Sequence, residues 1–576
     1  MKKDVWREAI AASADPERAA KQLELLRQAG ATEMLKSASP DAAAVIAALL
    51  AGSQALGEML MAHPDWLAGL LNLNELKVAR SAKQFQRATE QLLSAPLKSR
   101  DYADALARLR LFKQQEIIRI AARDLARLAT FVQITRELSD LADACLDAVF
   151  HVCWRQLTEK FGQPFHQDVN GRWHPTSFCI LALGKLGGQE LNYSSDVDLM
   201  FVYAEEGVVF RQKPAGPELS GRGISNHQFF RHLVEAFVSE VGRLTPEGML
   251  YRVDLRLRPE GKTGPLARSL EGYENYYWEY GQPWERLMLT KARFIAGDPD
   301  LANDFMEIIQ PFRYPRSLSP QALEEVASMK TRLETEVVKP GELDRNVKLG
   351  RGGIREIEFL VQSQQVLRAG AQPFLANHQT LAALDKLARY GVLPQEDAEA
   401  LSKAYVFLRE VEHRLQMENN LQTHTIPSER RARQRLARLM GFSTLEEFEA
   451  TLDQYRKTVR TLYEQFLKLE PEESAPQLPD FDREEAQWKQ LLHNRAFRDP
   501  DKALRLVRTF VSGPGYGHVH PRTEKKARTI LARLLDLCPR RDESDPDFAK
   551  RFPDGDPDST RLSDPDRVLA LSLIHI

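Results

Sequence analysis

Two aspartates at alternate positions of an apolar run constrain this chain more than any other feature of its sequence. Residues 186–201 read LGGQELNYSSDVDLMF, with Asp196 eight residues after a double glycine and Asp198 two residues further on. Strand side chains alternate between faces, so both carboxylates share one face while Val197 and Leu199 enter the core on the other. Burying an unpaired carboxylate costs several kcal/mol or shifts its pKa. We therefore expect a divalent cation to neutralise the pair.

A third acid, Asp254, lies in the segment YRVDLRLRP, which we predict to be another strand with Arg252, Arg256 and Arg258 on the same face as the acid. Oxygen ligands favour Mg²⁺, with Mn²⁺ as the alternative, over zinc, and arginine side chains suit phosphate. A solvated strand face is the alternative interpretation of the arginines. The pattern predicts three aspartates as catalytic residues and metal ligands, and two arginines that bind a nucleotide: Asp196, Asp198 and Asp254, with Arg256 and Arg258.

The turn that precedes the paired aspartates offers further groups for a nucleotide. Gly187 and Gly188 leave backbone N–H groups open to phosphate oxygens, and Ser194 and Ser195 can donate hydroxyl hydrogen bonds. The spacing is not that of a P-loop, and we expect Lys185 at the surface. An exposed edge strand with solvated acids would also give Asp-x-Asp, but the double glycine, the apolar flanks and the third acid favour catalysis. Together these features form the pattern of the nucleotidyltransferase superfamily.

Composition changes along the 576 residues predict the architecture, and this length suits three or four domains. The segment SFCILALG is nearly all apolar, as expected for a central strand covered on both faces. We predict an α+β fold, in which a nucleotidyltransferase (polymerase-β-like) domain with a small mixed β-sheet is flanked by large all-α domains. The expected domains are a helical region at 1–145, the catalytic domain at 146–315, a helical bundle at 316–470, and a linker with the start of a further helical region at 471–576.

Charge and cysteine content exclude several classes of protein. The net charge of −2 gives no general attraction to nucleic acid or to anionic membranes. The start MKKDVWREAI lacks the apolar core of a signal peptide, and the apolar run at 42–52 is too short to span a bilayer. The four cysteines are scattered without Cys-x-x-Cys spacing. We expect a cytoplasmic protein that binds neither nucleic acid nor membranes.

Longer stretches resemble one family closely. ALGKLGGQELNYSSDVDLMFVY, YRVDLRLRPEGKTGPLARSLEGYENYYWEYGQPWERLMLTKARFIAGD and NVKLGRGGIREIEFLVQSQQ are similar to the glutamine-synthetase adenylyltransferase/adenylyl-removing enzymes, and the resemblance covers most of residues 40–470. NYSSDVD together with KLGRGGIREIEF resembles the N-terminal, deadenylylating module of that family. The resemblance implies removal of AMP from a tyrosine of glutamine synthetase by inorganic phosphate, with release of ADP. A full-length member would also attach AMP from ATP.

The resemblance also carries residue roles and partners. It implies that Asp196, Asp198 and Asp254 bind the metal, and that Gly187, Gly188 and Ser195 contact the nucleotide phosphates. The implied partners are glutamine synthetase as protein substrate and the PII nitrogen-regulatory protein, with glutamine as an effector. Two other motifs have structural interpretations. We expect GRGGIREIEF, with Arg351 and Arg355, to open an ordinary capped helix rather than a catalytic anion site. We expect the aromatic run YENYYWEY at 273–280 to pack in the core.

The chain departs from the family at its end, and other functions stay open. Residues 470–576 hold no second GG…D-x-D module, and the chain stops soon after a capping box at Ser563. We therefore expect a truncated sequence that lacks the attaching activity. One alternative is another Mg²⁺-dependent nucleotidyltransferase, either PII-uridylylating or acting on a small substrate, although no HD-type His-Asp pair is seen. A second is a non-catalytic module that senses PII and glutamine.

Overall fold

The computed structural model describes residues 2–214, 223–261, 263–316, 343–468, 478–481, 484–495, 497 and 499–512, with seven positions between 527 and 538. The chain folds as two compact units, Met1–Glu464 and Gln465–Ile576. The capping box expected at Ser563 lies outside the described residues.

The first unit opens with a helical region that ends in one long helix. Its helices are α1 (Lys2–Ala11), α2 (Pro16–Leu26), α3 (Thr32–Lys36), α4 (Pro40–Gly52), α5 (Gln54–Ala62), α6 (Leu67–Leu71), α7 (Leu73–Leu76), α8 (Ala82–Ser99), α9 (Tyr102–Leu125) and α10 (Phe131–Phe161). A capping box of Thr130 and Gln133 starts α10. This helix packs on α8 and α9 and also on the sheet domain. The expected boundary at 145/146 therefore falls inside α10.

A mixed sheet follows, in the strand order β6-β4-β3-β8 with β7 also pairing with β4. Strand β3 (Phe178–Leu183) is antiparallel to β4 (Val197–Tyr203) and to β8 (Arg293–Gly297). The short β6 (Val253–Asp254) and β7 (Arg268–Ser269) run parallel to β4. A second, smaller sheet has the order β2-β1-β5, formed by β1 (Gln163–Gln167), β2 (Trp173–Pro175) and β5 (Val208–Phe210).

Strand β3 is buried along its whole length. Phe178, Ile180 and Ala182 belong to the core shared with α10 and α12 (Asn226–Gly242), whereas Cys179, Leu181 and Leu183 belong to a second core. The second core is built with α13 (Leu270–Glu279), α14 (Pro283–Leu289) and α15 (Pro299–Ile308). The alternation of neighbouring residues between two cores is the period of a strand. It confirms the prediction of a central strand covered on both faces.

The strand predicted around Asp254 is much shorter than expected. Only Val253 and Asp254 pair with β4. The backbone N–H of Arg256 donates to Asp254 Oδ1 at 2.8 Å, so the chain turns directly after the acid instead of extending. The prediction that positions 252 to 258 share one strand face was therefore wrong beyond residue 254.

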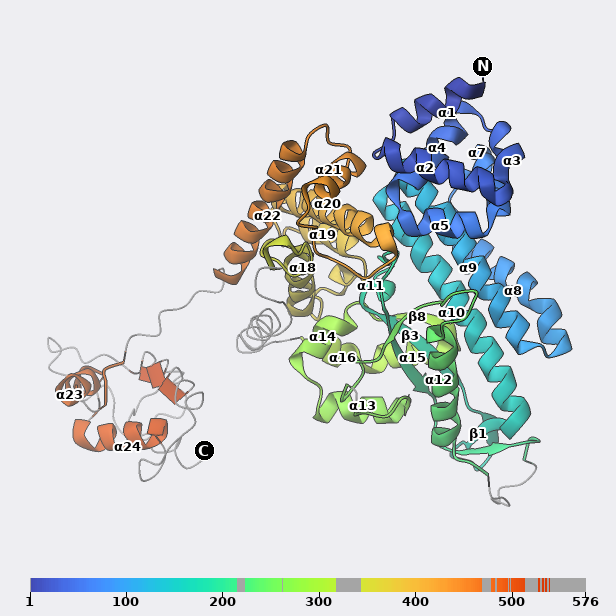
Figure 1. Ribbon diagram of the computed structural model, residues 1–576. Helices are drawn as coiled ribbons and strands as arrows, with labels where there is room; N and C mark the ends of the chain where they lie inside the picture. The colour runs from blue at the N-terminus through green and yellow to red at the C-terminus, as the bar shows by residue number, and fades with distance from the viewer. Residues whose placement is uncertain are drawn as a thin grey trace. The chain divides into compact units, whose positions relative to one another are not determined.

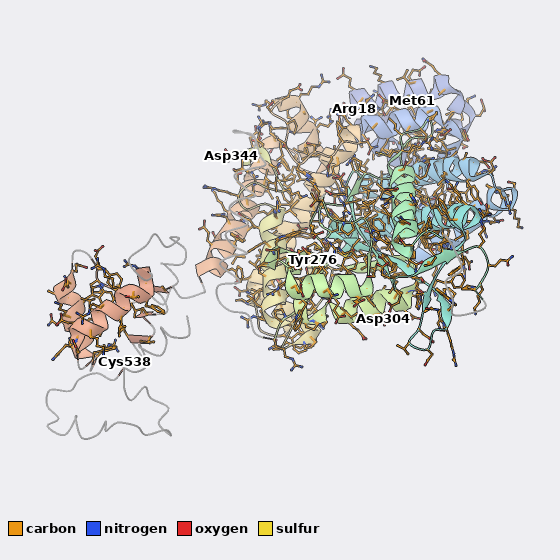
Figure 2. All side chains as sticks on the ribbon, turned by 90° about the horizontal axis from the view of Figure 1, so that it is seen from below. Arg18, Met61, Tyr276, Asp304, Asp344 and Cys538 are labelled. Carbon is orange, nitrogen blue, oxygen red and sulfur yellow. The ribbon has the colours of Figure 1, made fainter. Side chains whose placement is uncertain are left out.

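The aromatic run forms α13, as expected. Tyr273, Tyr276 and Tyr277 are buried in the second core, and Tyr276 is labelled in Figure 2. The hydroxyl of Tyr273 donates to Phe201 O of β4 at 3.1 Å. These contacts confirm that the run serves packing, although Trp278 and Tyr280 are exposed.

The first unit closes with a second group of helices. These are α16 (Gln310–Arg313), α18 (Ile354–Arg368), α19 (Thr380–Arg389), α20 (Gln395–Asn419), α21 (Arg430–Leu439) and α22 (Leu445–Lys468). Figure 1 shows α20 and α21 beside the N-terminal helices α2 and α5. There Arg18 of α2 and Arg435 of α21 both bind Glu418 of α20 at 2.7 Å. The N-terminal helices and this second helical group thus enclose the sheet domain's turn at 184–194 between them.

The second unit contains α23 (Glu485–Asn494) and α24 (Pro500–Ser512) around a small core. Phe481 stacks on Trp488, and Cys538, labelled in Figure 2, belongs to the same core. Among the described residues no single helix is long and apolar enough to cross a membrane. The helices α4 and α5 meet that test only as a pair bent by 117°. The fold as a whole confirms the predicted α+β class with flanking helical regions.

Candidate active site

Two of the three predicted aspartates are neighbours in the sheet. Asp198 on β4 and Asp254 on β6 form a pair in the parallel register, and adjacent strands lie about 4.8 Å apart. Asp196 comes just before β4, one alternation from Asp198. Val197 and Leu199 enter the core on the other face, as predicted. The carboxylates stand at the end of β4 where the second core, which holds Met200 and Val202, gives way to polar side chains.

Electrostatics agrees with this convergence. Burial, together with the charges of Asp254 and Asp196, raises the pKa of Asp198 to about 7 against the opposing charges of Lys348 and Arg256. Like charges at short range disfavour ionisation of each other. The structure therefore brings together the three acids that the sequence singled out.

Arginines balance two of the acids. Arg252 Nε donates to Asp196 Oδ1 at 2.7 Å, and Gln422 Nε2 donates to Asp196 Oδ2 at 3.1 Å. Arg256 Nε lies 2.8 Å from Asp254 Oδ2 and 3.0 Å from Oδ1. Among the described residues, no three His, Cys, Asp or Glu side chains are arranged in a group that could hold a metal ion.

The donor set nevertheless fits a hard divalent cation. Mg²⁺ and Mn²⁺ take carboxylate oxygens, and three carboxylates lie together here. The pKa of Asp198 is raised because the carboxyl is buried and lies near the charges of Asp254 and Asp196. Asp196, Asp198 and Asp254 are thus the residues that would hold the cation.

A glycine contacts the central acid, but it is Gly184 rather than the double glycine. At Gly184 the backbone has φ +54°, and a Cβ there would collide with Asp198 Oδ2. Gly187 instead packs against the carbonyl groups of Lys291 and Ala182, and its own carbonyl accepts from Arg293 Nε at 3.2 Å. Gly188 faces His378 O and Glu190. Close packing accounts for both glycines, so their contact with phosphate stays a prediction.

The two predicted serines differ in exposure. Ser194 is buried; its N–H donates to Gln416 Oε1 at 3.0 Å and its hydroxyl to Asn420 O at 3.2 Å. Ser195 is half-buried beside Asp196. Ser194 therefore ties the turn to the end of α20, and Ser195 keeps the more accessible position of the two.

The predicted arginines also differ. Arg256 is exposed and stays at the carboxylate cluster through Asp254. Arg258 is 5% exposed, and its guanidinium donates to the carbonyls of Leu255, Gly264 and Pro265 at 3.0, 3.0 and 2.6 Å. The structure does not bring Arg258 to the aspartates, because the strand that would have aligned it ends at residue 254.

Sequence reasoning missed a buried ion pair next to the site. Lys185, expected at the surface, is largely buried and its Nζ lies 2.7 Å from Glu412 Oε1 on α20. Burial lowers the pKa of Lys185 to about 7, against the attraction of Glu412. His424 Nδ1 lies 2.7 Å from the same carboxylate oxygen. A signal for this contact exists in α20, where buried polar residues recur at helical spacing: Arg409, Glu412, His413 and Gln416.

The α18 N-terminus is closed by its own loop. The N–H groups of Ile354 and Arg355 donate to the carbonyls of Val347 and Lys348 at 3.0 and 3.1 Å. Glu356 accepts from Gly352 N at 3.1 Å. The loop thus satisfies the first N–H groups of α18, and Gly353 at the N-cap adds no side-chain cap.

A small mixed sheet with helices on both faces, and with carboxylates on β4 and β6, is consistent with the α+β fold of a nucleotidyltransferase. Residues 43–308 match the family model of glutamate-ammonia ligase adenylyltransferase, and residues 324–467 match that of GlnD PII-uridylyltransferase. The first of these matches, with the curated relatives described next, confirms the resemblance seen in the sequence.

Three curated relatives carry the same name, bifunctional glutamine synthetase adenylyltransferase/adenylyl-removing enzyme. The protein of Nitrosococcus oceani is 40% identical over 62% of this chain and 36% of its own length. That of Hahella chejuensis is 34% identical over 78% of this chain and 44% of its own. That of Thioalkalivibrio sulfidiphilus is 34% identical over 80% of this chain and 47% of its own length. The chain thus spans less than half the length of these relatives.

Proposed function

We propose that this chain removes AMP from an adenylylated tyrosine of glutamine synthetase by phosphorolysis. The observation that carries the proposal is the register pair of Asp198 and Asp254, with Asp196 beside them, in a chain similar to adenylyl-removing enzymes. The catalytic domain would occupy residues 146–315.

The proposed reaction exchanges one phosphodiester bond for a phosphoanhydride bond. An oxygen of inorganic phosphate attacks the α-phosphorus of tyrosyl-AMP, and the bond from that phosphorus to the tyrosyl oxygen breaks. The products are ADP and the unmodified tyrosine, whose oxygen takes up the proton from the phosphate. In-line displacement of this kind needs positioning and charge stabilisation more than covalent chemistry.

The chain's own residues would position the reactants. Asp196, Asp198 and Asp254 would hold Mg²⁺, or Mn²⁺ in its place, and the cation would supply positive charge to the phosphate oxygens. Arg252 and Gln422 fix the Asp196 side chain from two sides. Ser195 directly precedes Asp196, and the exposed Arg256 pairs with Asp254, so both would contact the nucleotide. Gly184 lets the turn approach Asp198 without a side chain.

We also propose that the chain's partners include PII, with glutamine as an effector, and that a full-length protein attaches AMP from ATP. The support is the match of residues 324–467 to a PII-uridylyltransferase model and the printed name of the relatives. The second helical group would receive the signal, since α20 contacts the site through Glu412 and Gln416.

The test is release of ADP from adenylylated glutamine synthetase with Mg²⁺ and phosphate. Asp198→Asn and Asp196→Asn should lower the rate at least about a hundredfold. Asp304→Asn, an exposed acid on α15 (Figure 2), is the matched control and should leave it unchanged. Unaltered release by Asp198→Asn would contradict the proposal. Binding of PII without any ADP release would favour the sensing module instead.

A further inference from the structure

The loop that leads into α18 holds one lysine in a fixed position. Asn346 Oδ1 accepts the backbone N–H groups of Lys348 and Leu349 at 3.0 and 2.8 Å. The carbonyl of Lys348 accepts from Arg355 N at 3.1 Å. With hydrogen bonds on both sides of the residue, the Lys348 backbone is locked while its side chain stays half-buried.

This loop is bound to a second segment that contacts the aspartates. Val347 N donates to His424 O at 2.9 Å, and Asn346 pairs with Thr425. Two residues earlier in the second segment, Gln422 donates to Asp196 at 3.1 Å. The second helical group therefore carries Lys348 to the edge of the carboxylate cluster.

Lys348 differs from the other cation that acts on the central acid. The Lys348 loop is joined to the segment of Gln422, which contacts Asp196, and Arg256 contacts Asp254 directly. Arg256 is committed to Asp254, whereas Lys348 forms no ion pair or side-chain hydrogen bond with any described residue. The neighbouring Lys185 is likewise committed, to Glu412. A half-buried ammonium group without a fixed counter-ion beside an anion-handling site is available for a ligand.

The proposed reaction brings an attacking anion to a cluster that already holds three acids. Coulomb repulsion between phosphate and carboxylates must be offset on the side from which phosphate enters. Arg252 and Arg256 already form ion pairs with Asp196 and Asp254. A compact lysine charge suits a small, freely placed phosphate.

We propose that Lys348 binds the inorganic phosphate that attacks the adenylylated tyrosine, with its Nζ donating to a phosphate oxygen. This role rests on the proposed function. It makes the second helical group part of the substrate site, because Lys348 precedes α18 and lies outside the sheet domain.

Steady-state release of ADP at varied phosphate tests the role. Lys348→Gln should raise the KM for phosphate on the order of tenfold or more, with the KM for adenylylated glutamine synthetase unchanged. Lys348→Arg should restore much of the affinity, since the charge is kept. Lys403→Gln, which removes an exposed lysine from α20, is the matched control. An unchanged KM for phosphate in Lys348→Gln overturns the proposal, as does an equal change for both substrates.

A binding measurement separates this role from the function on which it rests. Inorganic phosphate, added with Mg²⁺ in a thermal-shift assay, should raise the Tm of the wild type and of Lys403→Gln but not that of Lys348→Gln. If the wild type releases no ADP, the proposed function fails, whereas a phosphate response lost only in Lys348→Gln still supports the anion site. A phosphate response that is absent in the wild type, or equal in all variants, overturns the role of Lys348.

Discussion

Asp198 on β4 and Asp254 on β6 lie opposite each other in a parallel pair of strands, with Asp196 next to them. Arginines pair with Asp196 and Asp254, whereas burial and the charges of these two acids raise the pKa of Asp198 to about 7. Ionisation of Asp198 in the folded chain therefore costs folding stability, which the proposed cation would offset. Stability and function are thus opposed at one side chain.

This opposition predicts a pH-dependent gain of stability in Asp198→Asn. The folded chain binds a proton at Asp198 up to about pH 7, whereas an unfolded carboxyl loses it near 3.8. The contribution of the Asp198 carboxyl to the free energy of unfolding therefore falls as pH rises from about 4 to 7, and it is constant above pH 7. In EDTA, urea unfolding should show Asp198→Asn more stable than the wild type above pH 7, by at most roughly 4 kcal/mol, and equal to it near pH 4. A difference independent of pH would contradict this origin.

Divalent cations should make the wild type more stable than Asp198→Asn. Binding to the folded state alone stabilises by RT ln(1 + [L]/Kd), about 2.7 kcal/mol at a hundredfold excess over Kd. Titration with Mn²⁺ should raise the Tm of the wild type and of the control Asp304→Asn, and leave Asp198→Asn and Asp254→Asn unchanged. Equal shifts in all four proteins would place the cation elsewhere.

Local patterns predicted the parts of the fold that depend on near neighbours. The unbroken apolar run predicted that β3 is a buried strand, and the alternation of residues predicted that Asp196 and Asp198 share one face. The third strand was misjudged because R-x-D-x-R-x-R alternates like a strand. One side-chain bond from Asp254 to the N–H of Arg256 ends it.

Contacts between distant segments could not be predicted in this way. Lys185 and Glu412 are 227 residues apart and meet only because the second helical group docks against the turn. A lysine in a glycine-rich turn carries no local sign of that partner. The packing of Gly187 against the backbone of Lys291, over a hundred residues on, likewise has no local sign in the sequence, and its contact with phosphate stays a prediction.

Substitution of the two arginines after Asp254 should affect different properties, folding stability for Arg258 and substrate binding for Arg256. Arg258→Met removes three hydrogen bonds from a buried guanidinium to backbone carbonyls and should destabilise the fold by roughly 2–4 kcal/mol. Arg256 is exposed, so Arg256→Met should change stability by less than about 1 kcal/mol and instead raise the KM in the ADP-release assay. Urea unfolding and kinetics on the same preparations check both. A stable Arg258→Met with a raised KM would return Arg258 to the nucleotide site.

The double glycine offers the sharpest contrast between packing and phosphate binding. A Cβ on Gly187 would lie 2.7 Å from Ala182 O and closer still to Lys291 O, and backbone cannot yield easily. Gly187→Ala should therefore cost roughly 2–3 kcal/mol in urea unfolding. A Cβ on Gly188 would lie 3.0 Å from His378 O and 3.1 Å from Glu190 Oε2, so about 1 kcal/mol is expected there.

Gly69 in α6 is the matched control for these two substitutions, because a Cβ there meets nothing within 4 Å. Gly69→Ala should be neutral or stabilising by up to about 1 kcal/mol, since alanine favours helix. If Gly187→Ala unfolds like the wild type but binds ADP more weakly in a thermal-shift assay, the glycine serves phosphate. Loss of stability with unchanged ADP affinity of the folded fraction identifies close packing between α11 (Gly184–Gly187) and the start of β8 as its role.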